Sequence, residues 1–239
     1  MNIAHQKISA SELHYLPSNN MHPANTRFHF SFANYYEPTR MGFGALRVFN
    51  DDDIKPKGGF GRHPHKDMEI ISYVVNGEIT HKDSMGNEDT LKRGEVQYMS
   101  AGSGVFHSEY NKTNKDLRLL QIWILPPSQG LPRLYGSHKF EKKERENQLL
   151  NIVSSITGDA KVKIHQDINM YVSQLEDTKS LEFEIEKNRQ IYFIQIEGTS
   201  NINGIELNHG DAMEVTQESK LDIVAINNSH FLFIEMKEA

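Results

Sequence analysis

The sequence contains no cysteine among its 239 residues, which excludes disulfides, thiolate metal sites and iron–sulfur clusters. Any metal must therefore be held by nitrogen and oxygen ligands, for which 12 histidines are available. A dense stretch of lysine and arginine is also missing, and the formal net charge is −6. This charge argues against direct binding to nucleic acid or to an anionic membrane surface.

Long apolar stretches are absent as well. None approaches the roughly 20 residues that a transmembrane helix needs. The N-terminal segment MNIAHQKISASELHYLP lacks the continuous apolar core of a secretory signal. We therefore expect a cytoplasmic protein that does not contact a membrane.

What the chain does contain is a series of short apolar segments separated by turn residues, among them RFHFSFANYY, MEIISYVV, LRLLQIWIL and RQIYFIQIEG. Their lengths and their β-branched and aromatic residues predict strands, and their spacing predicts an all-β sandwich or barrel. One helix is expected over Lys139 to Ile152, where charged neighbours lie four residues apart. It follows Pro132 and would form a short helix in a connector between two halves.

The two halves resemble each other. LKRGEVQYM at 91–99 has a counterpart in LNHGDAMEV at 207–215, and YVVNG at 73–77 is echoed by FIQIEG at 193–198. Self-similarity at a large offset indicates a duplicated domain rather than a short repeat. We expect an N-terminal domain over residues 1–130 and a C-terminal domain over residues 131–239.

The segment GRHPHKDMEII places two histidines on either side of a proline. In an extended segment successive side chains point to opposite faces, so His63 and His65 share one face and can converge on one ion. Glu69 is also an even number of residues away and would share that face. The segment therefore predicts half of a metal site at the start of a strand.

The segment AGSGVFHSEYN supplies the other half. His107 and Glu109 are again two residues apart and share a face of an extended segment. Three imidazoles and one carboxylate suit Fe(II), Ni, Cu, Mn or Zn, and not a calcium site. Four protein ligands on an octahedral metal would leave two positions open for other molecules.

These residues also carry a family resemblance. GRHPHKDME, HKDSMGN and RGEVQYMSAGSGVFHSEYN resemble the motifs of the pirins of the cupin superfamily, over roughly residues 26 to 127. The resemblance implies a bicupin with two jelly-roll-like β-barrels and one mononuclear metal, Fe(II) by preference, in the N-terminal barrel. The C-terminal barrel would lack a metal site. The metal ligands of the family fall here on His63, His65, His107 and Glu109, and Glu69 stays open as a ligand or as a partner of a ligand histidine.

The resemblance also implies an activity, that of quercetin 2,3-dioxygenase. A flavonol and O2 would be the substrates, the ring would open with loss of carbon monoxide, and Glu109 would be the general base for the flavonol hydroxyl. The alternative is a metal-containing regulatory protein that binds a protein partner without turnover. We expect a monomer in either case.

Three further features receive a structural interpretation. Residues 50–53, Asn-Asp-Asp-Asp, lack the spacing of an EF-hand and are interpreted as an acidic turn. His81 precedes a hairpin turn and is expected to be exposed. Trp123 follows an apolar run and is expected to pack in the core.

Overall fold

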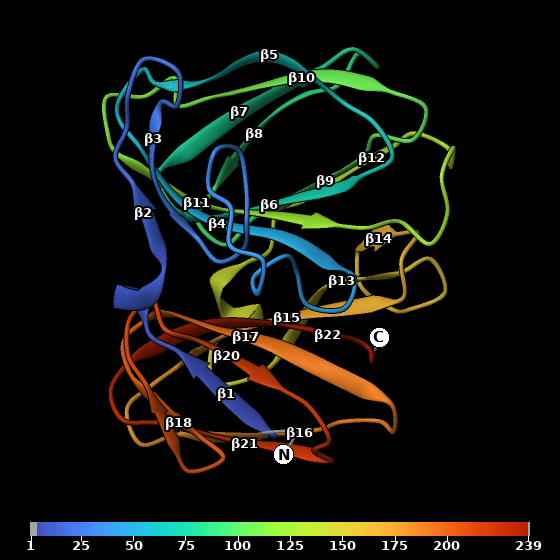
Figure 1. Cartoon of the computed structure of the whole chain (residues 1–239). Helices are drawn as coiled ribbons and strands as arrows, with labels where there is room; N and C mark the ends of the chain where they lie inside the picture. Colours follow the sequence, from blue (N-terminus) through green and yellow to red (C-terminus); the bar gives the residue numbers. More distant parts are fainter. Residues whose placement is uncertain (1–3, 239) are drawn as a thin grey trace. The chain divides into compact units, whose positions relative to one another are not determined.

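The computed structural model describes residues 4–238, and these form a protein built almost entirely of strands (Figure 1). The predicted all-β fold is confirmed. The chain divides into two compact units, which we call the first unit (His14–Phe140 and Val162–Gln166) and the second unit (described residues 4–13, 141–161 and 167–238). The predicted domain boundary at residue 130 stays a prediction. Among residues 4–238, no helix has the length and apolar character needed to cross a bilayer.

The first unit contains two antiparallel sheets. The larger sheet has the spatial order β12 (Leu134–His138), β9 (Val96–Ser100), β6 (Glu69–Asn76), β11 (Leu117–Ile124), β4 (Leu46–Ile54), β3 (Ala24–Phe28) and β2 (His14–Leu16). The smaller sheet has the order β5 (Gly59–His65), β10 (Val105–Tyr110), β7 (Glu78–Asp83) and β8 (Glu88–Lys92). The short strand β14 (Val162–Ile164) also belongs to this unit.

The second unit repeats this arrangement. Its larger sheet contains, side by side, β1 (His5–Ile8), β20 (Ala212–Val215), β17 (Arg189–Glu197), β22 (Ser229–Lys237), β15 (Ile168–Leu175) and β13 (Leu150–Ser155). Its smaller sheet has the order β16 (Ser180–Glu184), β21 (Lys220–Ala225), β18 (Ser200–Ile202) and β19 (Ile205–Leu207). Two 3₁₀ turns complete the elements, η1 (Ala10–Glu12) and η2 (Lys142–Glu144). The matching sheets agree with the predicted duplication.

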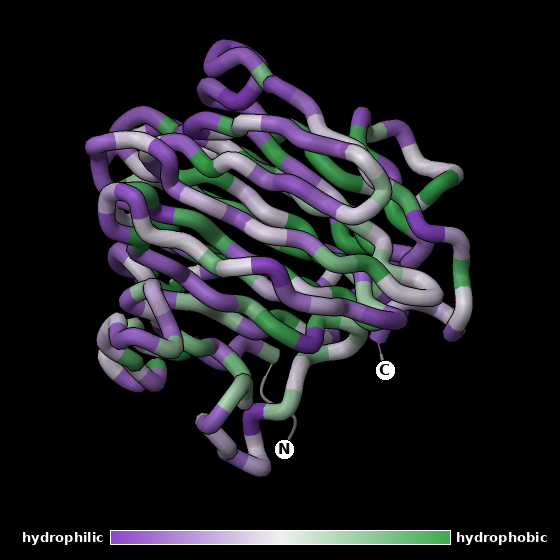
Figure 2. The backbone as a smooth tube through the Cα atoms, turned by 90° about the horizontal axis from the view of Figure 1, so that it is seen from above, coloured by the Kyte–Doolittle hydropathy of each residue, from purple (hydrophilic) through white to green (hydrophobic). Residues whose placement is uncertain are grey.

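Hydropathy alternates along the strands, because each strand turns one face inward and the other outward (Figure 2). In β21, Leu221, Ile223 and Ala225 are buried, whereas the residues between them are exposed. Buried residues of the second unit, among them Phe193, Leu221 and Phe233, form an apolar cluster. In the first unit a separate cluster forms around Ile79 and Leu119.

The helix predicted over Lys139–Ile152 is wrong in its extent. Only η2 is helical, and β13 already begins at Leu150. Asn147 has a φ of +53°, which an α-helix does not allow, and its backbone N–H donates to the carbonyl of Gln174. The connector therefore contains a short helical turn where charge pairing predicted a longer helix.

The acidic run at 50–53 is a strand and not a turn. It lies within β4, and Asp51 and Asp52 are both buried. Arg118 on β11 binds Asp51 through two hydrogen bonds of 2.9 and 2.7 Å. The interpretation as an acidic turn is wrong because Asp51 and Asp52 have partners on neighbouring strands, which the local sequence does not reveal.

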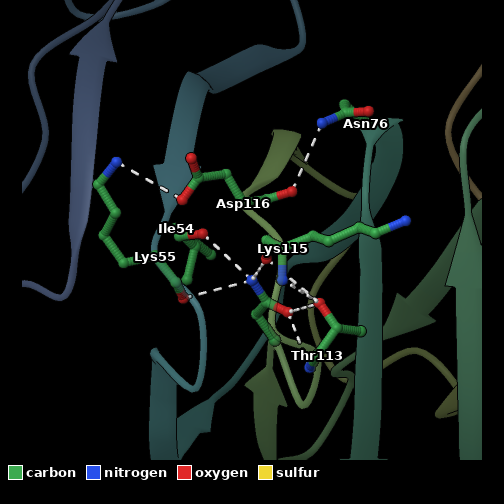
Figure 3. A network of polar contacts seen from close by, with 7 residues as sticks. Ile54, Lys55, Asn76, Thr113, Lys115 and Asp116 are labelled. Carbon is green, nitrogen blue, oxygen red and sulfur yellow. Dashed lines mark hydrogen bonds and ion pairs between the residues drawn. The ribbon is translucent and has the colours of Figure 1, made fainter.

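Asn111 fixes the chain directly after β10. Its amide nitrogen Nδ2 lies 3.3 Å from the carbonyl oxygens of Ile54 and Lys55 and 2.7 Å from that of Lys115. Its Oδ1 accepts hydrogen bonds from the backbone N–H and the hydroxyl of Thr113 (Figure 3). The last residue of the HSEYN motif is thus a structural anchor, which joins the ends of β4 and β10 and so holds the strand that carries His107 and Glu109.

Candidate metal centre

Two neighbouring strands bring the three predicted histidines together. His63 on β5 lies opposite His107 on β10, and His65 is two residues further along β5. The ring centroids are 4.4 Å apart for His63 and His107, 4.7 Å for His65 and His107, and 4.8 Å for His63 and His65. One ring nitrogen from each histidine lies within 4.8 Å of the others. The spacing of two residues therefore places all three rings at one point.

The hydrogen bonds of His63 set its tautomer. Its Nδ1 lies 2.7 Å from the carbonyl oxygen of Gly61, and because a carbonyl can only accept, Nδ1 carries the hydrogen. The other nitrogen, Nε2, faces Nε2 of His107 at 3.0 Å. A ligand histidine that donates its second ring N–H to a backbone carbonyl is the usual arrangement at a metal site.

Two of the three imidazoles, those of His65 and His107, are kept neutral by their surroundings. Burial, together with the neighbouring histidines, lowers the pKa of His65 to about 3. Burial and the rings of His63 and His81 lower the pKa of His107 to about 3 as well. Neutral imidazole is the form that binds a metal, so these two side chains are ready to act as ligands near neutral pH.

Glu109 is buried and held by two polar neighbours. The hydroxyl of Ser72 donates to Oε1 at 3.0 Å, and the amide nitrogen of Gln121 donates to Oε2 at 2.7 Å. A carboxylate offers about four lone-pair positions, so two remain free. Glu109 forms a second compact group with His107 and His81, and it is through His107 that it adjoins the three histidines.

The close approach of the two strands depends on a glycine. A Cβ atom at Gly59 would lie 2.3 Å from the carbonyl oxygen of Glu109 and 2.6 Å from the Cα of Tyr110. A side chain at this position would force β5 and β10 apart at this end of their pairing. Gly59 therefore helps to hold together the two strands that carry the histidines.

The four side chains open on a cavity of about 420 Å³ in the first unit. Its lining is partly aromatic and partly polar, and comprises Asn20, Met21, His22, Pro23, Phe32, Asn50, Asp52, Gly59, Phe60, Gly61, His63, His65, His107, Glu109, Gln121 and Trp123. Cavities of this size with a few convergent polar groups are typical of small-molecule sites.

The donor set fits a divalent transition metal. It consists of three imidazoles and one carboxylate. The rings of His65 and His107 are neutral, Nδ1 rather than Nε2 of His63 carries the hydrogen, and Glu109 has unused lone pairs. Their assignment as ligands stays a prediction.

Glu69 lies elsewhere, and the prediction that it shares a face with the two histidines is wrong. Its carboxylate accepts hydrogen bonds from the hydroxyl of Tyr98 at 2.7 Å and from the backbone N–H groups of His165 and Gln166 at 2.7 and 2.9 Å. The parity argument fails because β5 ends at His65 and Asp67 takes a φ of +48°, which breaks the alternation before β6 begins.

His81 is fully buried, so the prediction of an exposed side chain is also wrong. Glu109 on β10 lies directly opposite His81. The ring of His81 packs on that of Tyr135 with a centroid distance of 5.4 Å. Its Nε2 is 3.6 Å from the carboxylate of Asp83. His81 lies two residues after the apolar Ile79 and so shares its face of β7, which is the signal that could have shown this.

Trp123 is only partly in the core. Its ring meets Phe32 edge-on at 5.2 Å and His65 edge-on at 4.8 Å, and it lines the cavity. Sequence reasoning also missed Asp52 and Gln121 as cavity residues. Their parity with apolar residues of β4 and β11 indicates an inward direction, but it does not distinguish a cavity from a packed core.

Comparison with known proteins adds a family to this geometry. Residues 11–124 match the family model described as Pirin, and residues 151–236 match that of the quercetinase C-terminal cupin domain. A protein of Escherichia coli strain K12 named quercetin 2,3-dioxygenase is 41% identical over 209 residues, which are 87% of this chain and 89% of that protein. A pirin-like protein of Caulobacter vibrioides is 39% identical over 210 residues, 87% of this chain and 90% of that protein.

Solved structures agree with the sequence comparison. The bacterial pirin YhhW from Escherichia coli, in complex with nickel(II), superposes with a TM-score of 0.91 at 35% identity, over 98% of this chain and all of that chain (100%). The predicted bicupin architecture is thereby confirmed. A structure of a Geobacillus kaustophilus protein, at 20% identity and a TM-score of 0.82, has the same fold.

Proposed function

Because the chain belongs to the pirin family, we propose that it is a metal-dependent dioxygenase that opens the ring of flavonols such as quercetin with O2 and releases carbon monoxide. One observation carries the proposal. Three imidazoles and a carboxylate converge at a cavity of about 420 Å³ whose lining includes aromatic rings. That cavity suits a small aromatic molecule placed directly beside the candidate ligands.

The proposed ligands are His63, His65, His107 and Glu109, and the proposed metal is one Fe(II), with Ni, Cu, Mn or Zn as alternatives. The nickel(II) complex of the related bacterial pirin supports a divalent metal at this site. When bound, such a metal would supply Lewis-acid activation of a substrate hydroxyl.

The remaining steps belong to the side chains. Glu109 is proposed to accept the proton of the flavonol 3-hydroxyl on a carboxylate oxygen, as the general base. Ser72 and Gln121 each donate one hydrogen bond to Glu109, and so they fix the direction of its carboxylate towards the cavity. Phe32, Phe60 and Trp123 line the cavity and offer apolar surface for flat aromatic rings.

The cavity supports this function over the alternative of a regulatory protein. A protein that only signals through its metal needs a surface that responds to the metal, and no space beside the ligands. Here the candidate ligands themselves line the cavity. We therefore infer turnover of a small molecule, and a protein partner remains an outcome of the test below.

The test measures metal content and oxygen uptake on the same sample. Protein purified without added metal is expected to hold about one equivalent of a divalent metal, and to consume one O2 for each quercetin opened. His63→Ala is expected to lose both properties. Glu109→Gln keeps three imidazoles and is expected to lose oxygen uptake more completely than metal.

The control is His138→Ala, which removes a half-buried histidine of β12 outside the cavity. It should leave metal content and oxygen uptake unchanged. Full oxygen uptake by His107→Ala without bound metal would refute the proposal. One metal per chain with no oxygen uptake on any flavonol would shift the assignment to the regulatory alternative.

A further inference from the structure

A second polar group lines the cavity, away from the candidate ligands. Asp52 is only 2% exposed, and with Asn50 it occupies alternate positions of β4, so both side chains point to the cavity. The hydroxyl of Thr26 on β3 donates a hydrogen bond to Oδ1 of Asp52. Nε2 of His22, which also lines the cavity, lies 2.6 Å from Oγ1 of Thr26. The proposed reaction uses none of these groups.

The direction of these hydrogen bonds follows from the donors available. The hydroxyl of Thr26 has one hydrogen, and this is donated to Asp52. The oxygen of Thr26 can therefore only accept in the contact with His22, which places a hydrogen on Nε2 of His22. Both bonds are directed towards Asp52. Its second oxygen, Oδ2, has no hydrogen-bonding partner among residues 4–238 and is available to a molecule in the cavity.

The charge state of Asp52 decides what it can offer. Burial raises the pKa of Asp52 to about 8, and the nearby carboxylates of Asp51, Glu109 and Asp53 act in the same direction, against the hydrogen bond from Thr26. Near neutral pH the side chain therefore keeps its proton. With the hydroxyl of Thr26 donating to Oδ1, the proton is placed on Oδ2, and Asp52 becomes a hydrogen-bond donor towards the cavity.

We propose that Asp52 donates a hydrogen bond to an oxygen atom of the substrate, and that Thr26 and His22 hold its carboxyl group in position. This inference rests on the proposed function and defines its substrate class more closely. The substrate is an aromatic molecule with at least two oxygen atoms, one directed to the candidate ligands and a second to Asp52. A hydroxy ketone such as a flavonol meets that requirement.

The experiment uses the single tryptophan of the chain as its reporter. Trp123 lines the cavity, so its fluorescence should change when quercetin binds. Quercetin is titrated without O2 into metal-loaded wild type, Asp52→Asn and Asp52→Ala. Asp53→Asn is the matched control, because it makes the same change at the adjacent exposed position of β4.

The expected affinities show whether Asp52 acts on quercetin as a hydrogen-bond donor or through a negative charge. Asp52→Asn keeps a donor on Nδ2 and an acceptor for Thr26, and it should bind quercetin within about twofold of wild type. Asp52→Ala should bind about tenfold more weakly, the cost of one lost hydrogen bond. Asp53→Asn should match wild type. Equal loss in Asp52→Asn and Asp52→Ala would overturn the donor role, and wild-type affinity in Asp52→Ala would overturn the contact itself.

The positioning role of Thr26 has its own readout. Thr26→Val removes the hydroxyl at nearly constant shape and should weaken quercetin binding about threefold. In the double variant with Asp52→Ala, the Thr26 substitution should add nothing, because Thr26 acts through Asp52. Fully additive losses would overturn that role. Thermal unfolding of each variant shows whether a lost affinity reflects a lost fold.

The two proposals fail in different ways. If quercetin binds with the expected dependence on Asp52 but no O2 is consumed, the dioxygenase assignment fails and the recognition stands. If wild type consumes O2 and Asp52→Ala has a wild-type KM and affinity, the recognition fails and the dioxygenase stands. Absence of quercetin binding to wild type would overturn both.

Discussion

Gln121 offers a direct test of whether Glu109 is a metal ligand. Its amide nitrogen donates to Oε2 of Glu109 at 2.7 Å, and both side chains are buried. Gln121→Leu keeps the approximate volume and removes this donor. We expect the metal affinity to fall, because hydrogen bonds to a ligand carboxylate fix its direction.

The magnitude follows from the type of bond that is lost. A hydrogen bond to a charged group contributes about 1.5–3 kcal/mol. At about 1.4 kcal/mol for each factor of ten, Gln121→Leu should weaken metal binding by about 10- to 150-fold. Ser72→Ala removes a longer, hydroxyl-donated bond of 3.0 Å to the other oxygen and should cost less, about tenfold or below.

The assay is competition with a chelator of known affinity, with Trp123 fluorescence as the readout. Trp123 suits this purpose because its ring meets that of His65 at a centroid distance of 4.8 Å. The matched control is Gln190→Leu in the second unit, which removes another buried glutamine and its hydrogen bond to the carbonyl of Lys237. It should change stability and leave metal affinity at the wild-type value.

One result would refute the reasoning. If Gln121→Leu folds and binds the metal as tightly as wild type, then the hydrogen bond from Gln121 does not position Glu109 as a metal ligand. If Glu109→Gln also binds as tightly as wild type, Glu109 is not a ligand. The site would then consist of the three histidines, whose ring nitrogens form a compact group without it.

Two further predictions concern stability. Burial lowers the pKa of His29 from 6.5 to about 3, so on acidification the unfolded chain binds the proton before the folded chain does. The stability that the neutral His29 contributes is therefore complete above pH 6.5 and is lost as the pH falls towards 3. Between pH 7 and 5, urea unfolding of wild type should therefore lose about 2 kcal/mol more than His29→Gln, and equal losses would contradict this. Gly77 has a φ of +80°, and a Cβ there would lie 2.5 Å from the carbonyl oxygen of Asp116, so Gly77→Ala should cost about 3 kcal/mol. Gly86→Ala, with a φ of +97° and open space, should cost about 1 kcal/mol, and similar costs at both positions would show that the close contact contributes nothing.

The parts of the fold and site that could be predicted depend on local periodicity. The alternation of apolar residues identifies strands because a strand has one inward and one outward face. The same period of two places His63 beside His65 and His107 beside Glu109, and the structure brings both pairs to one cavity. These inferences need only neighbouring residues and the motif resemblance.

The parts that could not be predicted depend on partners far away in the sequence. The buried carboxyl group of Asp52 has its hydrogen-bond partner in Thr26, 26 residues earlier. Parity for Glu69 is lost in the few residues between β5 and β6, where Asp67 takes a positive φ. For the segment after Lys139, a backbone bond from Asn147 to the carbonyl of Gln174 replaces helical bonding. Each error therefore has a tertiary cause that local patterns do not carry.

The two units show how one architecture yields a site in one case and a packed core in the other. The smaller sheets have matching strand orders, so β16 and β21 of the second unit correspond to β5 and β10 of the first. At these strands the second unit directs Phe183, Leu221 and Ile223 into an apolar cluster, whereas the first unit directs the candidate ligands to a cavity. Buried imidazoles and carboxylates lose hydration and must find partners, whereas apolar side chains gain stability from burial. The polar side chains inside the first unit therefore lower its stability, and chemistry at the cavity explains why they are present. The function is specified by these side chains and not by the fold that the two units share.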